Sequence, residues 1–326
     1  MIITVTLNPA IDKTLEVPNF RLGRRHRSVE QRSLAGGKGL NVARALRRLG
    51  QPVLATGLAG GPTGTRIVEQ LTEESILNGF VRIHEESRTN TAVLDPTIAG
   101  EGNGSARTTE VNEPGPEVSE QEVEMLRDKL LYLAQGAQIC VFAGSLPRGV
   151  DSGLYAQLVR DVGRLGVITV LDADGEALRQ GVRAEPAVIS PNTLEAEGLV
   201  GHEFNDDDDH VVAVREMVAL GAREAIMTTP DGCFGQVIED GGPRVYRVRV
   251  EPLEPRASVG SGDAFLAGYV AARCDGRPPA ECLRFGVACG AESTQHLGAG
   301  LVEPRAVERL LDEVSVEAVP QAAEVS

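Results

Sequence analysis

Short, almost wholly apolar segments alternate with longer amphipathic ones along the chain, and this alternation restricts the fold more than any other feature. The apolar segments are Ile2–Leu7, Val53–Leu58, Gln138–Ala143, Val167–Asp172, Ala187–Ser190 and Glu224–Thr229. Strands that are apolar on both faces are typical of parallel sheets covered by helices on both sides. The alternation therefore predicts an α/β fold with a doubly wound, mostly parallel sheet and helices on both faces.

The amphipathic segments predict the covering helices. In Gly39–Gly50 the apolar residues form one stripe, and Gly50 ends the helix. This pattern places three arginines on the exposed side: Arg44, Arg47 and Arg48. The segments Glu117–Gly136 and Asp151–Gly166 repeat the same design.

Two regions depart from this alternation of apolar and amphipathic segments. Ile11–Ser33 and Arg88–Asn112 alternate polar and apolar residues, which is typical of half-exposed strands. We expect them to form a small β-sheet lid, inserted at about residues 11–33 and 88–112 into a single domain spanning residues 1–326, with a loop over Pro96–Arg107. Exposed strand edges favour pairing with a second copy, so we expect a homodimer that forms through the lid.

Composition excludes several classes of function. The chain has 47 acidic and 32 basic side chains, and a net charge of −15 argues against a nucleic-acid-binding protein. No apolar run approaches the ~20 residues of a membrane helix, and the start lacks a signal-peptide pattern. Five cysteines without a CxxC pair indicate reduced thiols and a cytoplasmic location. Asn205–His210 is expected to begin a helix, and the tail Glu317–Ser326 to fray.

Four polar motifs follow predicted strands or open predicted helices. They are "NPAID" (Asn8–Asp12), "AGGKGLNVAR" (Ala35–Arg44), "SPNTLEAE" (Ser190–Glu197) and "SVGSGDAF" (Ser258–Phe265). Ligands of open α/β sheets bind at the carboxyl ends of strands, so these motifs can meet. Glycines at a helix start let backbone amides approach an anion. An aspartate there either caps the helix or serves as a base beside the anion.

Together these motifs resemble the PfkB/ribokinase family of carbohydrate kinases, and within it the 1-phosphofructokinase and tagatose-6-phosphate kinase branch. The resemblance covers nearly the whole chain and is carried by "TLNPAID", "AGGKGLNVARAL", "SRTN", "TTEVNEPGP" and "GSLPRGV". It implies ATP-dependent phosphorylation of a ketohexose phosphate, from fructose 1-phosphate to fructose 1,6-bisphosphate. The alternatives are a tagatose-6-phosphate kinase, a 6-phosphofructokinase, or a catalytically silent sugar-phosphate-binding protein.

The resemblance also implies roles for particular residues. Asp263 matches the catalytic base, and the backbone amides of Gly260, Ser261 and Gly262 match the anion hole beside it. The implied contacts of the sugar phosphate are Asp12, Arg25, Arg27, Gly37, Lys38, Asn41, Arg88 and Ser145, with Lys38 and the arginines directed at its phosphate. We expect Asp263 to be ionised at neutral pH, because the helix dipole stabilises its charge.

The cofactors implied are ATP and Mg²⁺. Asn192 and Glu195 match a motif that orders Mg²⁺ through water near the ATP phosphates. The nucleotide site is further expected to include Thr228, Gly232, Ser258, Gly260 and Gly262. Three residues depart from the family pattern, since Ser261 replaces an alanine, Thr229 a glycine and Ala143 a serine. A dinucleotide-binding enzyme is disfavoured because no G-x-G-x-x-G follows the first strand.

Overall fold

A computed structural model describes residues 1–99, 106–251, 253–255, 257 and 259–320. In this part of the chain the main sheet has eleven strands in the order β15-β14-β13-β12-β11-β10-β9-β1-β4-β5, with β6 also paired to β4. These strands are β1 (Ile2–Thr6), β4 (Val53–Gly60), β5 (Leu77–Asn78), β6 (Val81–Ile83), β9 (Ile139–Ala143), β10 (Ile168–Asp172), β11 (Val188–Ile189), β12 (Glu224–Thr229), β13 (Gly232–Glu239), β14 (Gly242–Arg249) and β15 (Ser315–Val319).

The six predicted apolar strands are confirmed as β1, β4, β9, β10, β11 and β12, and they pair in parallel. Three antiparallel strands, β13 to β15, extend the sheet on one side. The prediction of a frayed tail from Glu317 was wrong for its first residues, because Glu317–Val319 belong to β15 and pair with β14. The rest of that predicted tail, residues 321–326, lies outside the described residues.

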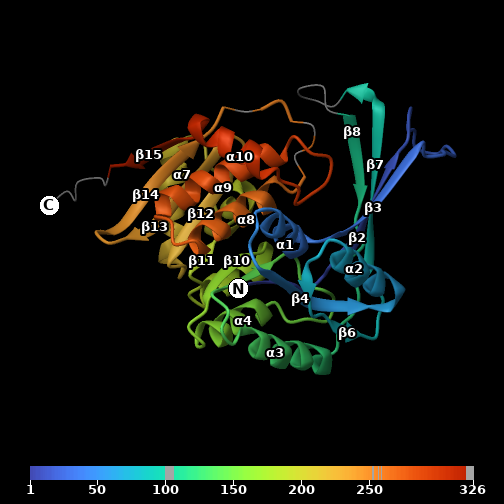
Figure 1. The fold of residues 1–326 in the computed structure, drawn as a ribbon, viewed down its shortest axis with the longest axis horizontal. Helices are drawn as coiled ribbons and strands as arrows, with labels where there is room; N and C mark the ends of the chain where they lie inside the picture. Colours follow the sequence, from blue (N-terminus) through green and yellow to red (C-terminus); the bar gives the residue numbers. More distant parts are fainter. Residues whose placement is uncertain (100–105, 252, 256, 258, 321–326) are drawn as a thin grey trace.

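Helices cover both faces of this sheet (Figure 1). They are α1 (Lys38–Arg48), α2 (Gly61–Glu73), α3 (Glu120–Ala134), α4 (Leu154–Gly163), α5 (Gly175–Val182), α6 (Thr193–Val200), α7 (Asp207–Ala219), α8 (Ser261–Cys274), α9 (Pro279–Ser293) and α10 (Pro304–Leu310), followed by a 3₁₀ turn, η1 (Leu311–Glu313). Buried apolar residues form two clusters. One includes α1, α2, α8, α9 and α10, and the other includes α3 to α7. Successive residues of β9 alternate between these clusters, as expected for a strand covered on both faces.

Helix α1 is more deeply buried than its pattern predicts. Arg47 and Arg48 are exposed as expected, but Arg44 is buried, so the prediction that it faces outward was wrong. The helix packs against β1, β4 and α8, and Arg44 contacts the carbonyls of Ala35 and Ala299 and the carboxylate of Glu74. A charged side chain in such a place needs several hydrogen-bond partners.

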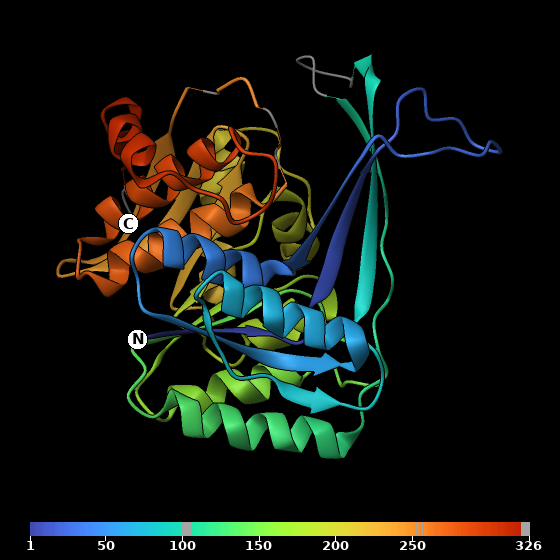
Figure 2. The ribbon, with the colours of Figure 1, turned by 45° about the vertical axis from the view of Figure 1, so that its right-hand side comes forward.

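The lid is a separate four-stranded sheet in the order β3-β2-β7-β8. Its strands are β2 (Ala10–Glu16), β3 (Glu30–Gly36), β7 (Arg88–Ala99) and β8 (Ala106–Val111). Figure 2 shows it standing beside the main body, with the loop between β2 and β3 projecting from its far end. The prediction of strands in these two regions is confirmed, although β3 continues to Gly36 and leads directly into α1. Residues 100–105 of the expected lid loop lie outside the described residues.

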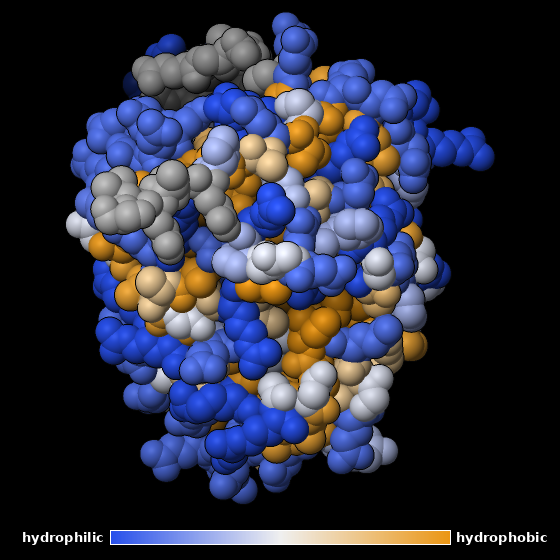
Figure 3. Space-filling view, turned by 90° about the vertical axis from the view of Figure 1, so that its left-hand side faces the viewer, coloured by the Kyte–Doolittle hydropathy of each residue, from blue (hydrophilic) through white to orange (hydrophobic). Residues whose placement is uncertain are grey.

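On the side of the molecule away from the lid, the face around β13, β14 and β15 carries both hydrophilic and hydrophobic patches (Figure 3). Across the ranges that the structure describes, no helix is both long and apolar enough to cross a membrane. The five cysteines are free, and four of them are buried.

Candidate active site

The start of α8 holds the carboxylate that the sequence singles out. Asp263 lies in the first turn, is 7% exposed and accepts a 2.8 Å hydrogen bond from Nδ2 of Asn41 on α1. Burial raises the pKa of Asp263 to about 7, with a further contribution from the negative charge of Asp172. The expectation of full ionisation at neutral pH was therefore wrong, because burial outweighs the stabilising effect of the helix end.

The glycines before Asp263 shape the same helix start. Gly260 is the N-cap with a left-handed φ of 84°, and a Cβ there would lie 2.5 Å from Cβ of Ala299. Both observations explain a glycine at this position. The N–H groups of the first helical turn, which begins at Ser261, have no acceptor within the helix and can bind an anion. A Cβ at Gly262 would meet open space, so Gly262 leaves room at the helix start.

Lys38, the first residue of α1, forms two ion pairs. Its Nζ lies 2.8 Å from Oδ1 of Asp172 and 3.0 Å from Oε1 of Glu195. Burial opposes the charge of Lys38, but the two carboxylates outweigh it and raise the pKa of Lys38 above its usual range. The structure thus places this predicted phosphate ligand among carboxylates from β10 and α6.

Asn192 and Glu195 form a capping box at the start of α6. Oδ1 of Asn192 accepts a bond from the backbone N–H of Glu195 at 2.9 Å, and Oε2 of Glu195 accepts one from the backbone N–H of Asn192 at 3.0 Å. This reciprocal pair satisfies backbone N–H groups at the helix start, and Glu195 combines this role with the ion pair to Lys38. The carboxylate therefore connects the helix start to the centre of the site.

The residues expected around the nucleotide lie in part beside this capping box. Thr228 forms an isolated bridge with Asn192, and its carbonyl accepts a 3.3 Å bond from Oγ1 of Thr193. Gly232 begins β13, where a Cβ would lie 1.9 Å from the carbonyl oxygen of Val248, so its glycine is required by strand packing. Ser258 lies outside the described residues.

A second polar group lies at the base of the lid. Oδ1 of Asp12 accepts a 2.9 Å bond from Nδ2 of Asn90, its neighbour across the β2–β7 pair. Burial raises the pKa of Asp12, although the bond from Asn90 and the charge of Arg88 oppose the rise. A Cβ at Gly36 would lie 1.8 Å from Oδ2 of Asp12, which explains the glycine that precedes Gly37.

Arg88 and Ser145 complete this group. The guanidinium of Arg88 donates to the carbonyl of Asn8 at 3.2 Å and to that of Glu113 at 3.0 Å. Nδ2 of Asn8 in turn donates to Oγ of Ser145 at 3.4 Å. These contacts bring the ends of β1 and β9 and the segment after β8 to the base of the lid.

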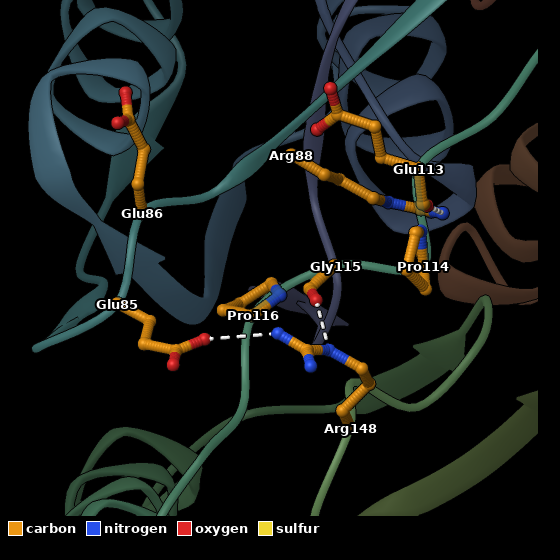
Figure 4. A pocket seen from close by; sticks show the side chains of 8 residues that line it. All are labelled: Glu85, Glu86, Arg88, Glu113, Pro114, Gly115, Pro116 and Arg148. Carbon is orange, nitrogen blue, oxygen red and sulfur yellow. Dashed lines mark hydrogen bonds and ion pairs between the residues drawn. The ribbon is translucent and has the colours of Figure 1, made fainter.

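A cavity of about 270 Å³ lies beside Arg88 (Figure 4). It is lined by Glu85, Glu86, Arg88, Glu113, Pro114, Gly115, Pro116 and Arg148. Arg148 lies at the lower side of this view, where it pairs with Glu85 at 3.2 Å and donates to the carbonyl of Gly115 at 2.8 Å (Figure 4). A second cavity of about 340 Å³ borders Asn192 and Glu195.

Two of the predicted phosphate ligands lie elsewhere. Arg25 and Arg27 are exposed on the loop between β2 and β3. Six residues of β3 separate that end of the lid from Gly36, which at about 3.3 Å per residue is about 20 Å. The structure does not bring this loop to Lys38 or Arg88.

The sequence interpretation missed three residues of the site: Asp172, Asn90 and Arg44. Asp172 ends the strand predicted over Val167–Asp172, so its place at the carboxyl end of a parallel strand was a usable signal. Asn90 belongs to the quoted "SRTN" motif. Arg44 ends the quoted "AGGKGLNVAR" motif, but its position in the helical pattern indicated exposure.

The chain is similar to known carbohydrate kinases in sequence and in fold. The model of the pfkB family carbohydrate kinases matches residues 5–306. A 1-phosphofructokinase of Borreliella burgdorferi is 30% identical over 317 residues, which cover 97% of this chain and 98% of the relative. A tagatose-6-phosphate kinase of Staphylococcus epidermidis is 29% identical over 320 residues, covering 97% of this chain and 99% of the relative. The structure of Escherichia coli phosphofructokinase-2 in complex with substrates and products superposes with a TM-score of 0.85 at 29% identity, covering 95% of this chain and 98% of that one.

Proposed function

Because the chain belongs to the pfkB family of carbohydrate kinases, we propose that it transfers the γ-phosphoryl group of ATP to fructose 1-phosphate and forms fructose 1,6-bisphosphate. The observation that carries this proposal is the buried carboxylate of Asp263, which meets Asn41 at the mouth of α8. A base beside a helix start, where backbone N–H groups can bind a phosphoryl group, suits transfer to a hydroxyl.

In the proposed reaction, Asp263 accepts the proton of the attacking sugar hydroxyl. The amides of Gly260, Ser261 and Gly262 stabilise the charge on the phosphoryl group as it moves. A pKa of about 7 suits this role, because a base works best when its pKa lies near the working pH. The positive charge of Lys38 lies between the carboxylates of Asp172 and Glu195. All three charges also act on Asp263.

The acceptor is proposed to bind at the base of the lid. Asp12 is proposed to accept hydrogen bonds from sugar hydroxyls, and Gly37, Asn41 and Ser145 are further proposed contacts of the sugar phosphate. Arg88 offers a guanidinium for the phosphate, and the cavity beside it supplies space. Arg25 and Arg27 remain proposed phosphate ligands only if their loop, or the same loop of a second copy, reaches the site.

ATP and Mg²⁺ are the proposed cofactors. Mg²⁺ takes oxygen ligands and keeps several waters, and the amide oxygen of Asn192 and the carboxylate of Glu195 fit that chemistry. Both already accept hydrogen bonds in the capping box, so they suit contact through water rather than direct coordination. Thr228, Gly232 and Ser258 are proposed to border the nucleotide.

One assay separates the candidate functions. Release of ADP is measured with fructose, fructose 1-phosphate, fructose 6-phosphate, tagatose 6-phosphate and ribose as acceptors. The highest kcat/KM is expected for fructose 1-phosphate. A higher value for tagatose 6-phosphate or fructose 6-phosphate would replace the proposed acceptor, and no ADP release with any of them would favour a silent sugar-phosphate-binding protein.

We further propose a homodimer that forms through the lid, in the cytoplasm. Apolar side chains are exposed on the lid, among them Leu22 at 90% and Val29 at 67%. The β3 and β8 edges of the lid sheet also have no neighbouring strand among the described residues. The free cysteines suit a reducing compartment.

A further inference from the structure

Arg44 is a buried cation with hydrogen bonds to four different segments. It lies one helical turn after Asn41 on α1 and is 4% exposed. Its Nη1 donates to Oδ1 of Asn41 at 3.1 Å and to the carbonyl of Ala299 at 3.3 Å. Its Nη2 donates to the carbonyl of Ala35 at 2.7 Å and to Oε1 of Glu74 at 3.0 Å. Its Nε donates to Oε2 of Glu74 at 2.5 Å. Every side of the guanidinium is therefore bound.

The contact with Asn41 determines which way that amide points. A guanidinium has donors and no acceptor, so the Asn41 atom that faces Arg44 must be the oxygen. The amide nitrogen then faces Asp263, to which it donates at 2.8 Å. If the amide rotated by half a turn, its NH₂ would face the donors of Arg44 and its oxygen would face the carboxylate. The contact with Arg44 would then be repulsive, and so would the contact with Asp263 in its ionised form.

The other partners of Arg44 surround the same site. Ala35 belongs to the end of the lid strand β3, next to the glycines that lead into α1. Ala299 lies against Gly260, the N-cap of the helix that holds Asp263. Glu74 follows α2 and supplies the carboxylate that balances the charge of Arg44. The guanidinium that contacts the Asn41 amide is thus itself fixed by the segments of Ala35, Glu74 and Ala299.

We propose that Arg44 is a positioning residue, which fixes the Asn41 amide so that its N–H groups face the base Asp263. This inference deepens the proposed kinase function and rests on it. The bond from Asn41 favours the charged form of the carboxylate. The charged groups that also act on Asp263 are Asp172 on β10, Lys38 on α1 and Glu195 on α6. None of them is among the hydrogen-bond partners that Arg44 has in the described part of the chain.

The titration of Asp263 in the unliganded protein tests this inference without any turnover. It is followed by ¹³C NMR of labelled aspartate carboxyl groups, with the signal assigned by its loss in Asp263→Asn. In Arg44→Gln the amide is released, and the pKa of Asp263 is expected to rise by about one to two pH units, as for the loss of one hydrogen bond to a charged group. Arg44→Met combined with Glu74→Gln should give the same rise and leaves no unpaired carboxylate, which protects against misfolding.

Two further variants separate positioning from general support of the fold. Asn41→Leu removes the donor itself and should raise the pKa of Asp263 similarly, whereas Arg44→Gln added to Asn41→Leu should raise it no further. Arg47→Gln is the matched control, since Arg47 lies on the same helix, is exposed and binds only the carbonyl of Ser75 among the described residues. It should leave the titration unchanged.

Kinetics provide the second readout. At pH 7 the proposed rise lowers the ionised fraction of Asp263, so kcat/KM for the sugar phosphate should fall about five- to fiftyfold in Arg44→Gln and recover at higher pH. An unchanged Asp263 titration in folded Arg44 variants would overturn the inference, as would additive shifts in the double variant. A wild-type protein without kinase activity would instead refute the proposed function, and the NMR titration would still report on Arg44.

Discussion

Replacement of Asp263 by asparagine is expected to stabilise the protein while nearly abolishing its activity. The pKa of Asp263 is raised from its ordinary value of 3.8 to about 7, chiefly by burial. Between these pH values the folded state keeps a proton that the unfolded state has released. The free energy of unfolding of the wild type therefore falls as the pH rises from about 4 to about 7. Asparagine has no charge to bury and removes this cost.

The size of the effect follows from the two pKa values. Their difference corresponds to about 4 kcal/mol at pH 8, where Asp263 is ionised in both states. At pH 5 the Asp263→Asn variant is expected to gain less than half of this stabilisation over the wild type, because the folded carboxyl of the wild type is then protonated. For a chain of 326 residues, 4 kcal/mol corresponds to a rise in Tm of about 6 °C.

The same variant should lose most of its turnover. General-base assistance is worth about 10²–10⁴-fold, so kcat is expected to fall by at least that factor with modest changes in either KM. Positioning and the helix-start amides remain and leave a residual rate. In the wild type, kcat/KM should fall on the acid side with a pKa near 7, so that its value at pH 6 is about a tenth of that at pH 8.

Thermal denaturation at pH 5 and pH 8, together with ADP release over the same pH range, measures all of these effects. If the variant is less stable than the wild type at pH 8, Asp263 chiefly supports its helix and the burial argument fails. If it is folded and turns over normally, another group is the base. A wild-type profile without an acid limb near pH 7 would refute the raised pKa.

Other parts of the site lead to further expectations. Arg88→Ala should raise KM for the sugar phosphate by tenfold or more and leave KM for ATP within about twofold. The same two KM values are measured for Arg148→Ala as a comparison, because Arg148 lines the same cavity. Equal effects on both substrates would contradict a phosphate contact. Glu195→Gln should raise the Mg²⁺ concentration needed for half-maximal rate, compared with Glu197→Gln on the same helix. An unchanged Mg²⁺ dependence would leave Glu195 as a helix cap and a partner of Lys38 only. Leu22→Asp with Val29→Asp should halve the mass measured by light scattering, whereas Leu220→Asp on the main body should not, and a monomeric wild type would exclude the lid dimer.

The parallel strands and the place of the site were accessible from the sequence, because their signals are local. Apolar runs that are buried on both faces identify β1, β9 and β12 wherever they stand in the sheet. The glycines before Asp263 likewise mark a helix start whose geometry depends on only a few neighbouring residues. In both cases the neighbours along the chain determine the structure.

What the sequence did not predict depends on neighbours that are distant along the chain. The burial of Arg44 follows from its contacts with the lid strand β3, with Glu74 after α2 and with Ala299, and no pattern within α1 contains that information. The raised pKa of Asp263 likewise comes from burial under other elements and from Asp172 on another strand. The pairing of Lys38 with Asp172 and Glu195 joins three separate strand or helix ends.

The bond between Asn41 and Asp263 spans 222 residues, and this separation has a consequence for how the protein is made. During synthesis α1 leaves the ribosome long before α8, so Asn41 cannot form its bond to Asp263 until most of the chain has emerged. Closing so long a loop costs chain entropy. Recovery of activity after denaturation is therefore expected to require that α8 docks onto α1 and restores this contact.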